Sequence, residues 1–156
     1  MTPAQAIDGM YELYAKTVAH LEQDGWDPAP EDGNVDGQIP EPCVLADGSR
    51  GVRYSIVLLG PGQAEPLAAA KFIASFWKSV GLTSQAAVPS NPKNSMMIAN
   101  GISSSVDAQY TVSQEGASLS LESACAAGDE EALHEKVVQN RERAASASPS
   151  PTPPVD

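Results

Sequence analysis

The sequence predicts an α+β fold, in which two main helices pack on a mainly antiparallel sheet of four to six strands. Apolar residues recur at helical spacing near the N-terminus and again over residues 65–80. Two later segments, between residues 106 and 125, alternate apolar and polar residues as half-buried strands do. A chain of 156 residues can bury one sizeable core. We therefore predict one domain over residues 1–128, an acidic C-terminal helix over 129–145 and a disordered Ser/Pro-rich tail over 146–156.

The first predicted element is an amphipathic helix that begins at Pro3 and ends at Gly25. Thr2 is placed to cap it, with Gln5 three residues later completing a capping box, and Trp26 is placed to fold back on the helix. Its apolar stripe consists of Ile7, Met10, Tyr11, Tyr14, Val18 and Leu21.

The middle of the chain predicts a loop, a buried strand and a second helix. Residues 27–50 contain four prolines and three glycines without periodicity, which predicts a long loop or a short extended segment. The run VRYSIVLLG at 52–60 predicts one strand, and residues 65–80 predict a helix that ends before Gly81. Shorter strands are expected near 84–88 and 96–99, with the polar turn PSNPKN between them.

The alternation at 106–125 predicts a β-hairpin. If Glu115 and Gly116 form a two-residue tip, Val112 faces Leu119 and every facing pair lies on one side of the sheet. Glutamate is a poor first residue for such a tip, so a longer loop is the alternative. The hairpin would direct Cys125 into the core at the end of a strand.

The two cysteines, Cys43 and Cys125, are too far apart for a CxxC redox or zinc motif. A disulfide and two free buried thiols are the alternatives, and the position of each cysteine beside a strand favours the disulfide. Such a bond would indicate an oxidising compartment.

The charge of the chain excludes several classes of function. Its net charge of -11 and scattered basic residues argue against nucleic acids and anionic membranes as partners. Residues 1–50 carry ten acids and two bases, whereas residues 51–128 carry four of each. No apolar run is long enough for a transmembrane segment. The start of the sequence lacks a signal-peptide pattern, so the chain either stays in the cytoplasm or is a mature segment whose export signal has been removed.

No catalytic residue can be assigned from motifs. GPGQAE at 60–65 resembles a dinucleotide-binding turn, but Glu65 stands at the third glycine position and would repel a phosphate. His134 and His20 lie in no recognisable zinc or nucleophile motif. We therefore expect no enzyme activity and no organic cofactor.

A partial calcium motif covers residues 32–43. Asp32, Asn34 and Asp36 have the DxNxDG spacing of a calcium-binding loop and could supply oxygen ligands. The closing glutamate is replaced by Cys43, and nearby prolines prevent an exiting helix, which excludes an EF-hand. The alternatives are a weak calcium site and a polar turn, for which Asp, Asn and Gly are the usual residues.

Taken in order, these features resemble the small lipoprotein-type domains of the actinobacterial cell envelope. The resemblance covers about residues 3–125: a long helix ending in Gly25-Trp26, then Cys43, the strand RYSIVLLG, a helix closing on Val80-Gly81-Leu82, and the hairpin YTVSQEGASLSLESAC ending in Cys125. It implies an exported α+β domain with a Cys43–Cys125 bridge and, in most relatives, no assigned activity. Relatives begin with a signal peptide and a lipid-bearing cysteine, and this sequence departs from that pattern.

We therefore expect an exported, envelope-associated binding or accessory protein, whose partner is a protein or a small envelope ligand and whose acidic loop 27–47 contributes to recognition. The alternative is a cytosolic acidic interaction protein of the immunity or inhibitor type. The sequence leaves the oligomeric state open.

Overall fold

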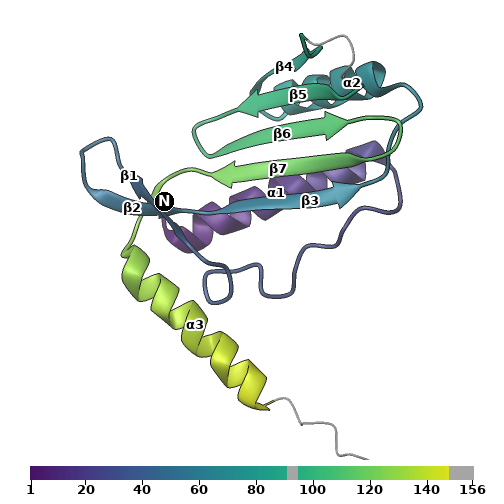
Figure 1. Cartoon of the computed structure of the whole chain (residues 1–156). Helices are drawn as coiled ribbons and strands as arrows, with labels where there is room; N and C mark the ends of the chain where they lie inside the picture. The colour runs from purple at the N-terminus through teal and green to yellow at the C-terminus, as the bar shows by residue number, and fades with distance from the viewer. Residues whose placement is uncertain (91–94, 148–156) are drawn as a thin grey trace, which may run out of the picture.

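The computed structural model describes residues 1–90 and 95–147, which form three helices and two antiparallel sheets (Figure 1). This arrangement confirms the α+β class. The helices are α1 (Pro3–Leu21), α2 (Pro66–Ser79) and α3 (Glu130–Ala147). The strands are β1 (Glu41–Val44), β2 (Arg50–Arg53), β3 (Ser55–Gly60), β4 (Thr83–Ala87), β5 (Met97–Ile102), β6 (Val106–Val112), β7 (Ala117–Ser123) and β8 (Ala126–Ala127).

The larger sheet has five strands in the order β3-β7-β6-β5-β4, all antiparallel to their neighbours. One face of this sheet is covered by α1, which packs on β6 and β7, and by α2, which packs on β4, β5 and β6. The core lies between the helices and this face because both helices present an apolar stripe to it. Its largest fully buried side chains include Trp77, Tyr54, Tyr110, Ile7, Met10, Ile73 and Leu119.

The smaller sheet has the order β1-β2-β8. The prediction of one strand over residues 52–60 is wrong, because two strands share this range: β2 ends at Arg53 and β3 begins at Ser55. Tyr54 lies between them, and the chain passes there from the small sheet to the large one. A continuous apolar run cannot show this change of partner, because both strands are partly buried. The expected loop 27–50 also contains β1 and the first residue of β2.

The capping box of α1 is confirmed: the Thr2 hydroxyl accepts from the amide of Gln5, and the Gln5 side chain accepts from the amide of Thr2. The helix ends earlier than Gly25, because Glu22 adopts a left-handed conformation after Leu21. Trp26 does fold back, but onto β3. Its indole lies so close to Gly60 that a β-carbon at that glycine would overlap the ring.

The β6–β7 hairpin exists with the predicted faces but a different register. Val112 pairs with Ala117 instead of Leu119, and every other facing pair is shifted by the same two residues. The reason is a longer tip, in which Ser113 and Gly116 form the closing hydrogen bond and the Ser113 hydroxyl accepts from the amides of Glu115 and Gly116. Cys125 consequently lies beyond β7, half-buried, and does not pair with Val106.

The C-terminal helix α3 is longer than the predicted 129–145 segment and extends away from the sheets (Figure 1). Val137 is its buried residue, and Leu133 packs beside the core. Most of the expected tail 146–156 and the last four residues of the expected turn at 89–94 lie outside the described residues. The division into a domain over 1–128 and appended segments stays a prediction.

Candidate functional site

The second face of the five-stranded sheet, turned toward the viewer in Figure 1, is uncovered by the described helices and strands. Because side chains alternate along each strand, the residues opposite to the core residues of β6 and β7 point to this face. Large apolar side chains remain exposed on it, with Val57 63%, Leu59 58% and Ile102 61% accessible. Exposed apolar side chains on an uncovered sheet face make that face a candidate contact surface.

Strand register arranges this face in three rows that cross the sheet from β4 to β3. The central row is rich in side-chain amides, and it consists of Gln85, Asn100, Gln109, Ser120 and Val57. One neighbouring row contains the charged residues, and it consists of Thr83, Ile102, Asp107, Glu122 and Ser55. The other is Ala87, Ile98, Thr111, Ser118 and Leu59.

A shallow groove of about 480 Å³ lies over the central and charged rows. Its lining combines amide side chains that can both donate and accept hydrogen bonds with apolar side chains at its two sides. Gln85, Asn100 and Gln109 contribute the amides, and Val57 and Ile102 the apolar contacts. This is the composition expected for a surface that orients a ligand by a few polar contacts.

The charged row has acidic residues and no basic one. Asp107 and Glu122 are directly opposite each other on β6 and β7. Arg53 at the end of β2 lies 3.3 Å from the Glu122 carboxylate and 3.7 Å from that of Glu41. Asp107 has no ion pair within residues 1–90 and 95–147. The groove is therefore acidic at Asp107.

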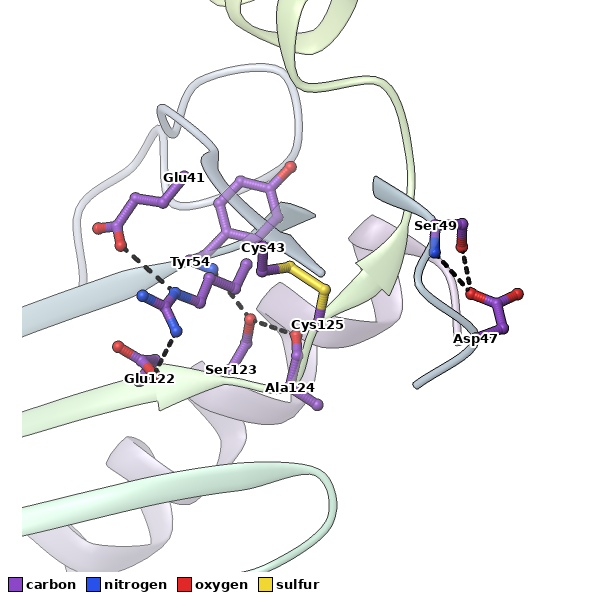
Figure 2. The surroundings of a disulfide bond; sticks show 10 residues. Glu41, Cys43, Asp47, Ser49, Tyr54, Glu122, Ser123, Ala124 and Cys125 are labelled. Atoms are coloured by element: carbon purple, nitrogen blue, oxygen red, sulfur yellow. Dashed lines mark hydrogen bonds and ion pairs between the residues drawn. A yellow bond between two sulfur atoms is a disulfide. The ribbon is translucent and has the colours of Figure 1, made fainter. Parts of the chain in front are cut away.

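Cys43 and Cys125 form a disulfide near the end of the sheet where Glu122 lies (Figure 2). The bond joins β1 to the segment between β7 and β8, with the two α-carbons 6.0 Å apart. Beside it, the Ser123 hydroxyl accepts from the amide of Tyr54 and donates to the carbonyl of Ala124 (Figure 2). These contacts, with the Arg53 ion pairs, hold the small sheet against the large one.

A second cavity, of about 670 Å³, lies between the β1–β2 hairpin and the start of α3. Its charged side chains have both signs: Arg50 lies among Asp129, Glu130 and Glu131. It contains no row of amides and no exposed branched side chain other than Val44. The uncovered sheet face is therefore the stronger candidate for a binding site.

The three residues of the calcium motif lie in the loop beside α3. The Asn34 side chain accepts from the amide of Asp36, which is the hydrogen bond of an Asx turn. The Asp36 carboxylate lies 2.6 Å from the ammonium of Lys136 on α3. In residues 1–90 and 95–147, no group of three or more His, Cys, Asp or Glu side chains could hold a metal ion. Calcium binding at Asp32, Asn34 and Asp36 stays a proposal.

The acidic loop that contains this motif runs along the edge strand β3. Asp27 bonds both the carbonyl and the amide of Leu59, at 2.8 and 3.1 Å, and the Gln38 side chain donates to the carbonyl of Ser55. Two tyrosines of α1 hold the loop in turn, because Tyr11 donates to Gln38 and Tyr14 donates to the carbonyl of Asp27. Burial, followed by the nearby carboxylate of Asp27, raises the pKa of Tyr14. The loop thus borders the uncovered face at β3.

Sequence reasoning missed the groove residues. The alternation in VDAQYTV already shows that Asp107 and Gln109 share the face opposite to the core. However, their neighbours across the sheet come from β5 and β7, and only strand order and register reveal that Asn100, Gln109 and Ser120 form one row. Neither histidine lies in the groove: His20 stacks on the rings of Phe72 and Phe76, and His134 lies near Glu130 on α3.

Comparisons with known proteins show a likeness of fold. No protein-family model matches the sequence, and no curated protein matches it. A crystal structure of a DUF4853 family protein from Actinomyces odontolyticus is similar, with a TM-score of 0.56 and 10% sequence identity over 81% of this chain and 67% of that one. None of the described helices is both long enough and apolar enough to cross a membrane.

Proposed function

We propose that this protein is an exported, disulfide-stabilised binding or accessory protein whose binding surface is the uncovered face of the five-stranded sheet. The observation that carries the proposal is the row of Gln85, Asn100 and Gln109 between exposed apolar side chains on that face. An antiparallel sheet can expose one face to water, and that face then carries mainly polar side chains. Here Val57, Leu59 and Ile102 interrupt the polar pattern.

The geometry favours binding over catalysis. The groove is wide and shallow, and its carboxylates, Asp107 and Glu122, lie without a histidine, lysine or cysteine nucleophile among its lining residues. Amides and hydroxyls of this kind orient a partner through hydrogen bonds, and the flanking apolar side chains add buried area. The acidic loop at β3 would extend the same surface, in agreement with the recognition role expected for residues 27–47.

The Cys43–Cys125 bond is consistent with an exported protein, because structural disulfides form and persist in oxidising compartments. The resemblance to actinobacterial envelope domains supports the same location. The alternative, a cytosolic acidic interaction protein of the inhibitor type, requires both thiols to be free in the cell.

Thiol alkylation decides between these two locations. Protein taken from its native compartment is alkylated before and after reduction, and its mass is measured. We expect two additional alkyl groups only after reduction. Alkylation of both cysteines without reduction would contradict the exported location.

Site-specific photo-crosslinking tests the binding surface. A photo-reactive amino acid is placed at Gln109 in the centre of the groove and, as a control, at Asp8, which is exposed on α1 and thus on the helix-covered side. We expect crosslinked products in native cells from position 109 and none from position 8. Equal products from both positions, or none from position 109, would exclude the sheet face as the binding surface.

A further inference from the structure

Asp107 and Glu122 place two carboxylates directly opposite each other on the neighbouring strands β6 and β7. Residues directly opposite in an antiparallel pair have β-carbons about 4.5 to 5.5 Å apart, and like charges at such positions destabilise the pair. Arg53 compensates Glu122 from the end of the sheet, but Asp107 has no such partner in the described part of the chain. A cation bound in the groove would relieve this repulsion and neutralise the charge of the Asp107 carboxylate.

We propose that the groove receives a lysine or arginine side chain from an extended segment of a protein partner, with Asp107 as the main contact and Glu122 as the second. This inference rests on the proposed function and specifies the partner of the same surface. None of the residues in the three rows of this face is basic and two of them, Asp107 and Glu122, are acidic, so the surface complements a basic segment.

The remaining groove residues suit a peptide backbone. Asn100 and Gln109 lie side by side on β5 and β6, and each amide can donate to a carbonyl and accept from an amide of the bound segment. Val57 and Ile102, at the two sides of the groove, can contact the apolar stems of neighbouring side chains. A divalent metal ion is a poorer fit, because calcium takes six to eight oxygen ligands and two carboxylates supply few of them.

The test uses fluorescence anisotropy of the full chain with labelled, unstructured probe peptides. One probe alternates lysine and threonine, a second has glutamine in place of lysine, and a third has glutamate. We expect the lysine probe to bind most tightly, the glutamine probe more weakly and the glutamate probe not at all. The affinity of the lysine probe should fall as sodium chloride is raised, because salt screens exposed charges.

Matched variants locate the contact. Asp107→Asn keeps the shape of the side chain and should lower the affinity for the lysine probe by about three-fold or more, in the range for a partly exposed ion pair. Asp8→Asn makes the same charge change on α1 and should leave the affinity unchanged. Asp107→Asn should also unfold at the same or a higher temperature than the parent, because it removes the repulsion from Glu122. A loss of binding through unfolding would therefore be recognised.

Several results would overturn the inference. Equal binding of the lysine and glutamate probes, or equal effects of Asp107→Asn and Asp8→Asn, would exclude a cationic partner at this row. Binding of calcium chloride with backbone amide shifts at residues 107 and 122 would assign the row to a metal. If the lysine probe does not bind while crosslinking at Gln109 succeeds, the proposed binding surface is retained and the proposal of a basic partner segment is wrong. If crosslinking also fails, both proposals are wrong.

Discussion

Thr17 is a fully buried polar residue that joins the two helices of the core. Its hydroxyl donates to the carbonyl of Leu13 at 2.7 Å and accepts from the Trp77 indole at 3.0 Å. Thr17→Val keeps the volume of the side chain but leaves the buried indole N–H without its partner. We expect a loss of about 1 to 3 kcal/mol in the free energy of unfolding, measured by urea denaturation. Thr111→Val, on the uncovered sheet face, is the matched control and should change stability by about 0.5 kcal/mol or less.

Tyr110 makes stability depend on alkaline pH. Burial raises the pKa of its hydroxyl from the ordinary tyrosine value of 10.0 to about 12. Below pH 10 both folded and unfolded states keep the proton, so the contribution to stability is fully present. It is lost as the pH rises through about 12, because the unfolded chain ionises first. Up to roughly 2 to 3 kcal/mol should disappear over this range.

Thermal unfolding between pH 9 and 12, with tyrosine absorbance as a second signal, measures this loss. Tyr110→Phe has no hydroxyl to ionise and should show a shallower decline. Tyr54→Phe is a useful comparison, because burial also raises the pKa of Tyr54. An unchanged pH profile in Tyr110→Phe would show that another group controls alkaline unfolding.

At the scale of elements, α3 is held to the acidic loop by polar contacts. Lys136 pairs with Asp36, Asn140 donates to the carbonyl of Asp36, and Arg141 donates to that of Gly37. The ammonium of Lys136 therefore competes with any cation that Asp32, Asn34 and Asp36 would bind. If the calcium proposal is correct, Lys136→Met should increase the rise in unfolding temperature produced by millimolar calcium, because a ligand that binds the folded state stabilises it.

Arg143→Met is the matched control for this prediction, since it also removes one positive charge from an exposed position of α3. It should respond to calcium as the parent protein does. No response to calcium in Lys136→Met would remove the calcium proposal and leave the loop as a polar turn that docks α3.

The elements themselves were largely predictable. Capping residues placed the start of α1 at Pro3, and apolar periodicity located α2, because these signals are local. The boundary between β2 and β3 was not predictable, because Arg53 and Ser55 belong to different sheets without any turn signal between them. The hairpin register was also missed, since the Ser113 hydroxyl stabilises a four-residue tip that competes with the shorter turn.

At the scale of the whole molecule, the disulfide connects distant parts of the chain. Cys43 and Cys125 are 82 residues apart, and a bond that closes such a loop should stabilise the fold by about 4 to 5 kcal/mol in the chain-entropy model. We expect the double variant Cys43→Ser, Cys125→Ser to lose a large part of this free energy in urea denaturation. The parent protein with reductant should behave as the double variant does. Equal stability with and without the bond would contradict its structural role.

The sequence by itself determined the fold class and the two core helices, and it favoured a disulfide between the two cysteines over two free thiols. It could do so because helix caps, apolar periodicity and alternation act over a few residues, and because two cysteines allow one pairing. The uncovered sheet face was decided by the tertiary structure. Asn100, Gln109 and Ser120 come from three strands, and only the order and register of those strands bring their side chains into one row. Asp107 faces Glu122 because the register of the β6–β7 hairpin differs by two residues from the predicted register. No local sequence pattern reveals that difference.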